Sequence, residues 1–129
     1  MSTIKSFEEI EAWKKGRVLA DEIFKIFLNT PASRDFGLKD QIGRSIGSVM
    51  DNIAEGFERG GNREFIQFLS IAKGSAAETQ SQLYRVLDRR YIAQEDFDRM
   101  YKETLAIIRL LGGLIAYLKK SGFKGPKFK

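Results

Sequence analysis

The fold is decided by residues 52–65, NIAEGFERGGNREF, which hold three glycines and two arginines in one short stretch. Gly60 and Gly61 stand where the end of a helix needs a residue that can take a positive φ, and Asn62 can cap a helix that follows. The stretch therefore predicts the turn of a helix hairpin. Free amides at the start of the second helix, beside the two arginines, also suit a phosphate. The glycine-Lys-Ser/Thr pattern of a phosphate-binding loop is missing, however, so the hairpin is favoured.

Apolar residues recur three or four positions apart on both sides of this turn, as they do on one face of a helix. The spacing predicts four helices, at about 7–28, from about 38 to the turn, from 62 to about 90, and at about 95–119. In the last two segments the steps of four and three alternate strictly, from Phe65 to Val86 and from Phe97 to Leu118, which indicates heptad seams. We therefore expect an all-α fold, an antiparallel up-down four-helix bundle with short connections.

The second predicted helix has small residues on one side, at Gly43, Ser45, Gly47 and Ser48. A glycine inside a helix costs about 1 kcal/mol relative to alanine, so close approach of another backbone is the expected compensation. The third and fourth predicted helices instead have more apolar residues than a bundle core needs. This apolar surplus consists of Ile66, Phe68 and Ile71 in the third helix and Met100, Ile107, Leu110, Leu114 and Tyr117 in the fourth. Burial of this surplus between subunits is favoured over a broad core in a monomer.

The composition excludes many kinds of site. With 129 residues, of which 43% are hydrophobic, the chain is long enough for one domain with a core. Cysteine and histidine are both absent, which removes disulfides, ordinary zinc sites, serine triads with a histidine base and Glu-x-x-His di-iron sites. The spacing of Ser70 and Lys73 matches serine acyl-transfer enzymes, but their companion motifs are missing and the match is interpreted as chance. We expect no enzyme activity, no catalytic residue, no metal and no cofactor.

The charge of the chain is unevenly placed. Residues 119–129 hold five lysines and no acidic residue, and the net charge is +5, so residues 1–118 are neutral overall. We expect residues 1–118 to form the bundle and residues 119–129 to form a flexible basic tail. The tail can contact nucleic acid or an anionic surface, or remain a solvated terminus, and both interpretations stay open. No apolar run is long enough to cross a membrane, so a cytoplasmic location is expected.

A second basic group, Arg85, Arg89 and Arg90, lies at the predicted end of the third helix. Basic side chains are favourable at a helix C-terminus, and guanidinium groups also suit bidentate contacts with phosphate, so capping and phosphate binding are both open. The candidate nucleic-acid-binding residues of the whole chain are Arg85, Arg89, Arg90, Arg59, Arg63, Lys119 and Lys120.

Several short blocks follow one another between residues 38 and 83. They are Gln41-Ile42 with Arg44, then Asn52-Ile53-Ala54-Glu55-Gly56, Arg63-Glu64-Phe65, Phe68-Leu69, Ile71-Ala72 and Gly74-Ser75, preceded near the start of the chain by Phe7 and Trp13. In these blocks the sequence resembles the bacterial 23S ribosomal RNA intervening-sequence proteins, whose relatives include the accessory protein of diversity-generating retroelements. It departs from their pattern at Gly43, at Gly47 and at Glu78-Thr79-Gln80.

The resemblance implies a homopentameric barrel of four-helix bundles and a nucleic-acid-associated role without a known catalytic activity. Relatives in the retroelement branch resemble adaptors that bind RNA and a reverse transcriptase. The family blocks imply structural roles for Gln41, Asn52, Glu55 and Gly56: hydrogen bonds within the bundle or hairpin, and close packing at the glycine.

We therefore expect an oligomeric, non-enzymatic protein that binds RNA or acts as an adaptor, with RNA and a protein such as a reverse transcriptase as possible partners and no membrane. Contacts would be mainly to phosphates, so affinity should fall as salt rises. Little base reading is expected, because no aromatic residues are interleaved with the basic ones along the sequence. The alternative is a protein-interaction scaffold with no nucleic-acid site.

Overall fold

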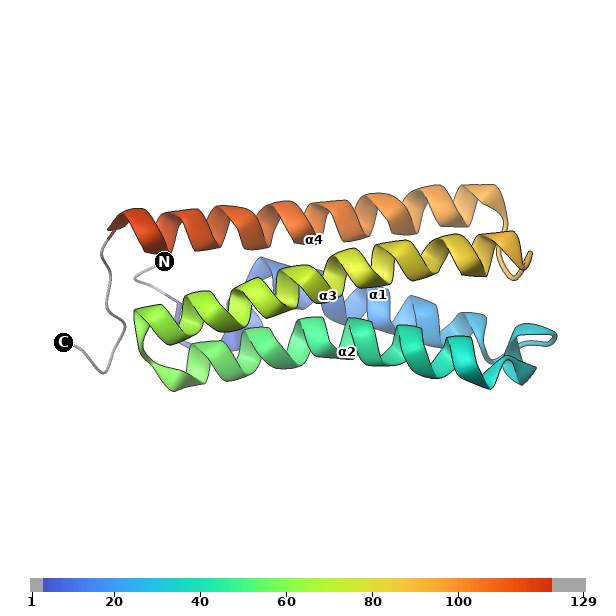
Figure 1. The fold of residues 1–129 in the computed structure, drawn as a ribbon, viewed down its shortest axis with the longest axis horizontal. Helices are drawn as coiled ribbons and strands as arrows, with labels where there is room; N and C mark the ends of the chain where they lie inside the picture. Colours follow the sequence, from blue (N-terminus) through green and yellow to red (C-terminus); the bar gives the residue numbers. More distant parts are fainter. Residues whose placement is uncertain (1–3, 122–129) are drawn as a thin grey trace.

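The chain folds into four long helices. The computed structural model describes residues 4–121, and in this range it contains no strand. The helices and two short 3-10 turns are η1 (Phe7–Glu9), α1 (Glu11–Ile26), η2 (Ala32–Arg34), α2 (Phe36–Arg59), α3 (Asn62–Asp88) and α4 (Gln94–Ser121). Successive helices run in opposite directions along one axis (Figure 1). The expected all-α fold with four helices is thus confirmed.

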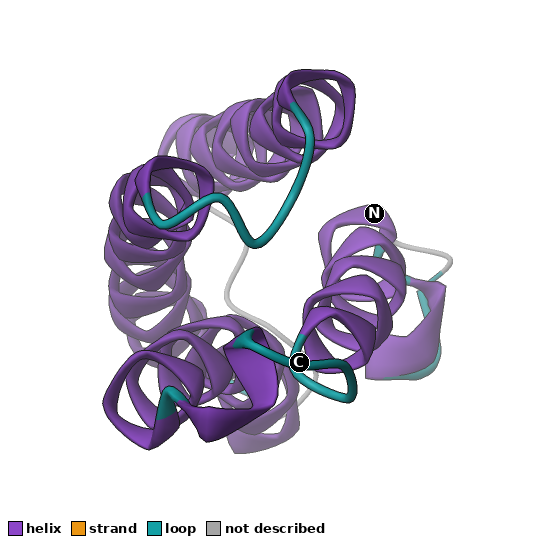
Figure 2. Cartoon of the chain, turned by 90° about the vertical axis from the view of Figure 1, so that its right-hand side faces the viewer, coloured by secondary structure: helices purple, strands orange, loops and turns teal. Residues whose placement is uncertain are grey.

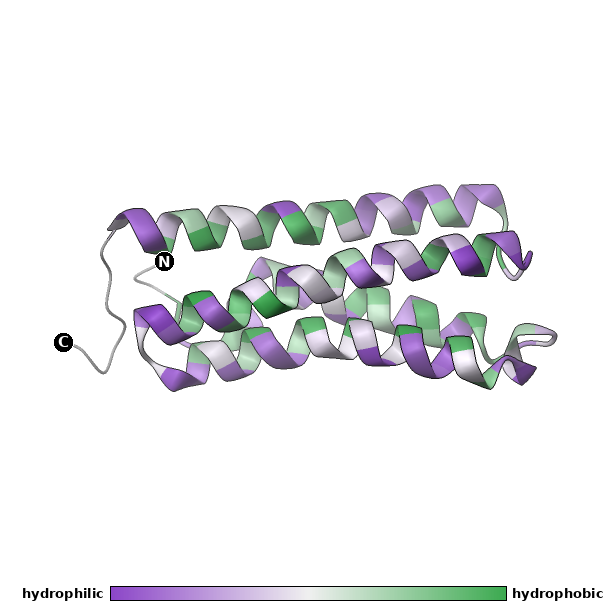
Figure 3. Cartoon of the chain, viewed as in Figure 1, coloured by the Kyte–Doolittle hydropathy of each residue, from purple (hydrophilic) through white to green (hydrophobic). Residues whose placement is uncertain are grey.

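The helices surround a common interior, which Figure 2 shows along the bundle axis. Hydrophobic and hydrophilic residues alternate along every helix at intervals that keep one face apolar (Figure 3). The predicted α3 seam lies wholly inside, since each of its members is buried: Phe65, Leu69, Ala72, Ala76, Thr79, Leu83 and Val86. In α4 the predicted seam is only partly right, because Met100 and Ile107 are buried while Tyr101 and Ile108 are half-buried.

Local sequence explains where most helices start and stop. Asp35 caps α2, because its side chain accepts a hydrogen bond from the Leu38 amide at 3.3 Å. Gly60 ends α2 with a φ of 79°, as the two glycines of the hairpin predicted. Asn62 does not cap α3 as expected: Gly61 holds the capping position, and the Asn62 side chain instead donates to the Leu118 carbonyl oxygen at 3.1 Å.

Two predicted boundaries differ from the observed ones. The first helix is interrupted at Ile10, whose backbone is extended, so η1 and α1 replace one continuous helix. At the other end, α4 continues to Ser121, and Lys119 and Lys120 are helical instead of starting a tail. The helix reaches this far because no glycine or proline stands between Gly113 and Gly122 and because lysines are favourable in a last turn. The rest of the expected tail lies outside the described residues.

Close helix packing occurs at glycines other than the expected pair. Nothing lies within 4 Å of where a Cβ would stand on Gly43 or Gly47, so the predicted close approach is not made there by the described chain. Gly16 and Gly56 are buried instead, and a Cβ on Gly56 would meet the Phe68 Cβ at 2.6 Å. A helical repeat identifies a small face but does not say which neighbour covers it.

A ladder of polar side chains joins α2 to α3. The Ser45 hydroxyl lies 2.7 Å from the Thr79 hydroxyl and 2.6 Å from Oε1 of Gln82, and all three residues are buried. One turn further along, Ser48 bonds Ser75 at 2.7 Å, and the Asn52 amide donates to the Ser48 hydroxyl at 2.9 Å. The two small serines therefore face α3, and their hydrogen bonds help to fix its register against α2.

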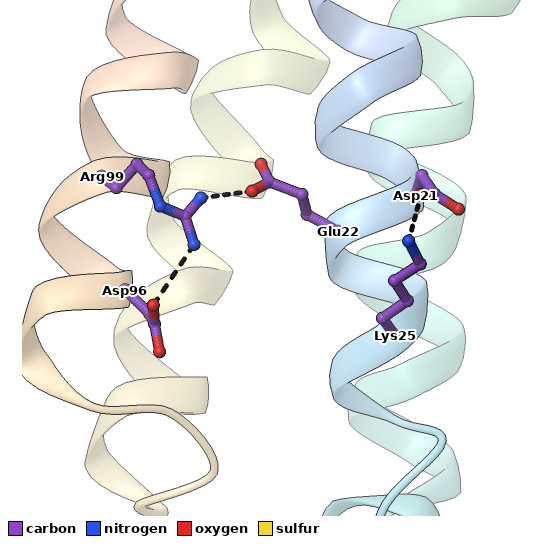
Figure 4. Close-up of polar contacts among 5 residues, drawn as sticks. All are labelled: Asp21, Glu22, Lys25, Asp96 and Arg99. Carbon is purple, nitrogen blue, oxygen red and sulfur yellow. Dashed lines mark hydrogen bonds and ion pairs between the residues drawn. The ribbon is translucent and has the colours of Figure 1, made fainter.

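The contact between α1 and α4 is of a different kind, because charged residues span it. Arg99 of α4 forms an ion pair with Glu22 of α1 and reaches Asp96 in its own helix at 3.3 Å (Figure 4). Lys25 pairs with Asp21 at 3.0 Å on another side of α1, away from α4. None of the helices within residues 4–121 is long and apolar enough to span a membrane.

Candidate nucleic-acid interface

The seven candidate cations divide between the two ends of the bundle. Arg59 and Arg63 flank the α2–α3 hairpin, and Lys119 and Lys120 occupy the last turn of α4. The bond from the Asn62 side chain to the Leu118 carbonyl joins these two elements, so the four cations share what we call the hairpin end. The other three, Arg85, Arg89 and Arg90, lie at the far end of α3, about 33 to 40 Å from Arg63, since a helix rises 1.5 Å per residue.

At the hairpin end, Arg59 is already engaged. Its guanidinium donates to the Glu55 carboxylate at 2.8 Å and lies 5.1 Å from the centre of the Phe68 ring. The hydrogen bond to Glu55 raises the pKa of Arg59, and the charge of nearby Glu64 contributes in the same direction. Arg59 therefore strengthens the α2–α3 contact and has only part of its guanidinium available for a ligand.

The remaining cations of this end are available. Arg63, Lys119 and Lys120 are exposed, and none of them forms an ion pair or hydrogen bond with any residue in the range 4–121. The start of α3 adds partial positive charge, because no side chain caps its first amides. Together these groups can hold phosphate oxygens, mainly through charge.

The opposite end combines charges of both signs. Arg89 donates to Asp35 at 2.6 Å, and the Tyr91 hydroxyl donates to the same carboxylate oxygen at 2.8 Å. Asp35 joins the α1–α2 and α3–α4 connections in this way, so Arg89 serves the fold. Arg85 and Arg90 are exposed and unpaired within the described chain, but Asp88 and the acidic first turn of α4 lie near them and reduce the local positive charge.

Hydrogen bonds also affect the titration of this cluster. The Tyr91 hydroxyl, and after it Arg89, hold the pKa of the Asp35 carboxyl below its ordinary value despite some burial. The same bond to Asp35 raises the pKa of Tyr91. The cluster is thus an ionic link between two connections, in which Arg89 is already engaged with Asp35.

The four family-block residues lie along α2. Asn52 belongs to the polar ladder, Glu55 pairs with Arg59 on the surface, and Gly56 is buried against Phe68. Gln41 is exposed and forms no hydrogen bond within residues 4–121. Within residues 4–121, no group of three or more acidic side chains is placed to hold a metal ion.

Sequence reasoning missed one feature, a cluster of aromatic rings on the surface between α3 and α4. Tyr84 of α3 packs against Phe97 of α4 at 4.8 Å between ring centres and against Tyr101 at 6.1 Å. Its rings come from two separate helices and are not interleaved with basic residues along the sequence. The available signal was the exposed position of Tyr84, one residue before Arg85 and off the α3 seam.

Comparisons with known proteins agree with the fold and the family resemblance. Residues 8–113 match the family model described as 23S rRNA-intervening sequence protein. The chain is also similar to a crystal structure from Bacteroides thetaiotaomicron, described as a protein with unknown function from the S23 ribosomal protein family. The identity is 26% and the TM-score 0.74, and the match covers 81% of this chain and 95% of that one. No curated protein sequence matches the chain.

Proposed function

The chain belongs to the 23S rRNA-intervening sequence protein family, and we propose that it is a non-enzymatic, oligomeric protein that binds RNA through the hairpin end of its bundle. The observation that carries this proposal is the grouping of Arg63, Lys119 and Lys120, which come from two helices and have no partner within the described chain. Unpaired cations attract phosphates without reading sequence, and the free amides at the start of α3 beside Arg63 act in the same direction.

The hairpin end supports this function better than the arginine cluster of the opposite end. There, Arg89 is bound to Asp35, and Asp88 and the acidic first turn of α4 stand close to Arg85 and Arg90 along the chain. Of the four cations at the hairpin end, Arg59 alone is paired within residues 4–121. The RNA contacts are accordingly assigned to Arg63, Lys119 and Lys120.

Self-assembly is part of the proposal. Ile71 of α3 and Leu110 and Tyr117 of α4 are exposed by 52%, 37% and 44%, although each belongs to the apolar surplus of its helix. Met100 and Ile107, also in that surplus, are buried within the chain. The exposed remainder suits contact with further copies, and a pentamer is the number that the family resemblance implies. Copies arranged in parallel would place their hairpin ends together and multiply a weak site.

The test is RNA binding across a salt series by the full-length chain. A variant with Arg63→Gln, Lys119→Gln and Lys120→Gln should bind RNA more weakly. The slope of log affinity against log salt concentration should be shallower by about 2, since each phosphate contact with single-stranded RNA contributes about 0.7 to that slope. The matched control, Arg85→Gln with Arg90→Gln, should retain wild-type affinity and slope. Equal losses in the two variants would contradict the assignment to the hairpin end.

The second candidate function is a scaffold that binds a protein partner through the exposed apolar residues. The same exposed Ile71 and Tyr117 favour it. Solution mass and capture of a partner after nuclease treatment separate the two functions. An intact oligomer that binds no RNA at low salt, yet retains a protein partner after nuclease treatment, would replace the RNA proposal by the scaffold.

A further inference from the structure

A shallow depression on the surface lies between α3 and α4, close to the connection that joins them. It has a volume of about 430 Å³ and is lined by Tyr84, Phe97, Asp98, Tyr101 and Lys102. Sites for small molecules usually measure about 300–1,000 Å³, so this one suits a single small planar group. It shares no residue with the hairpin end.

The rings in the depression are arranged to accept another ring. Tyr84 is 48% exposed, although it packs against Phe97 and Tyr101. The Tyr84 and Tyr101 rings meet nearly edge to face, with 79° between their planes, so they do not stack on one another, and the exposure of Tyr84 leaves much of its ring uncovered. Part of the Tyr84 ring therefore remains open to solvent beside a second, half-buried tyrosine.

Two opposite charges flank the rings. Asp98 accepts a hydrogen bond from the Gln94 amide at 2.9 Å through Oδ1, and a carboxylate retains further lone pairs for other donors. Lys102 is exposed and has no ion pair within residues 4–121. The depression thus offers an aromatic face, an anionic acceptor and a cationic donor within two turns of α4.

We propose that this depression binds one unpaired nucleobase of the RNA, with guanine preferred, a proposal that rests on the RNA-binding function above. The base stacks on the exposed face of Tyr84 with Tyr101 at its edge, and the Asp98 carboxylate accepts from the N1–H and N2–H₂ donors that guanine presents side by side. Lys102 pairs with a phosphate of the same strand. This adds base reading to an interaction otherwise made with phosphates.

A protein ligand fits the depression less well. Peptides that dock on helical proteins usually lay a strand or a helix along an extended groove with several apolar pockets. Here the aromatic surface is short, and charged groups of both signs lie on α4 beside it. One flat ring flanked by hydrogen-bonding groups is the occupant that this chemistry matches.

The test compares two single-stranded RNAs, eleven uridines and the same strand with a central guanosine. Tyr84→Ala should weaken binding of the guanosine strand by about 5- to 150-fold, because stacking of one base contributes about 1–3 kcal/mol. Tyr84→Phe, which keeps the ring, should bind like wild type. So should Phe24→Ala, which removes an exposed aromatic ring of α1 outside the depression. Asp98→Asn should abolish the preference for guanosine and leave affinity for oligouridine unchanged.

The outcomes separate this proposal from the one it rests on. If wild type binds RNA and Tyr84→Ala binds it equally well, the base site is wrong and the hairpin-end function stands. If wild type binds neither strand at low salt, both proposals fall. A loss of affinity in Tyr84→Ala that comes with a changed solution mass or a collapsed melting transition would also overturn the base site, because the ring would then serve assembly or folding.

Discussion

Gly56 of α2 leaves no room for a side chain beside Phe68 of α3, whose Cβ would lie 2.6 Å from a methyl group placed on the glycine. Gly43, on the same helix, has nothing within 4 Å of the equivalent position. Two glycines of one helix therefore differ in what they do. One permits the approach of a neighbouring helix, and the other faces open space.

This difference gives a matched pair of substitutions. Gly56→Ala should lower the free energy of unfolding by about 1–3 kcal/mol, because the new methyl group forces α2 and α3 apart. Gly43→Ala should raise it by about 0.5–1 kcal/mol, because alanine favours the helix and meets no neighbour. Urea denaturation of both variants beside wild type measures the two effects. If both variants changed the free energy of unfolding in the same direction, the close contact between Gly56 and Phe68 would be wrong.

Asp35 supplies a pH-dependent contribution to stability. Its pKa is lowered in the folded chain, chiefly by the hydrogen bond from Tyr91, so its contribution is present above the unfolded pKa of about 3.9 and is lost as pH falls through the folded value. Asp35→Asn should cost about 1–3 kcal/mol at pH 7, and the difference from wild type should shrink below about pH 4. Denaturation at several pH values measures this difference.

The control for Asp35 is Asp40→Asn. Asp40 pairs only with the exposed Arg44 one turn along the same helix, so its loss should cost less than about 0.5 kcal/mol at pH 7. If the cost of Asp35→Asn were equally small, the link between the two connections would not matter for stability.

The polar ladder should behave as one unit. Ser45→Ala leaves Thr79 and Gln82 without their shared buried partner and should cost about 1–3 kcal/mol. Thr79→Val should be costly alone, and the double variant should cost less than the sum by about 0.5–3 kcal/mol. Ser81→Ala, at an exposed position of α3, serves as the control and should change stability by less than about 0.5 kcal/mol. Strict additivity would mean that the hydroxyls do not interact.

The ion pair between α1 and α4 should be weak and sensitive to salt. Both partners are partly exposed, by 47% for the Arg99 side chain and 28% for Glu22. Arg99→Gln should therefore lower the free energy of unfolding by at most about 1 kcal/mol in dilute buffer, and by less at 1 M salt. Thermal melts at two salt concentrations test this. A cost that did not change with salt would indicate that Arg99 acts by packing.

Much of the fold followed from local sequence. The apolar repeat located the four helices, the heptad steps of α3 identified its buried residues, and Gly60 marked the end of α2. These features depend on residues within a few positions of one another, which is the range that sequence patterns describe. The small face of α2 was only half understood, because a repeat cannot show that the serines contact α3 while Gly43 and Gly47 remain uncovered.

The candidate site was less predictable, because it depends on contacts between distant parts of the chain. Arg89 and Asp35 are 54 positions apart, and nothing near Arg89 in the sequence reveals that it is paired. The separation of the seven cations into two ends, and the meeting of Tyr84 with Phe97 and Tyr101, likewise depend on how the helices are arranged. The residue types can be read from the sequence, but whether each side chain is free to bind a ligand depends on the fold.

Helix α3 also sets a length scale for the ligand. It runs without interruption from Arg63 at the hairpin end to Tyr84 beside the aromatic depression, about 32 Å at 1.5 Å per residue. If both proposals above hold, this rigid helix fixes the distance between the two RNA contacts of one bundle. A strand too short to span it can occupy one end only, and affinity rises in a step once the strand is long enough to reach both ends of the same bundle.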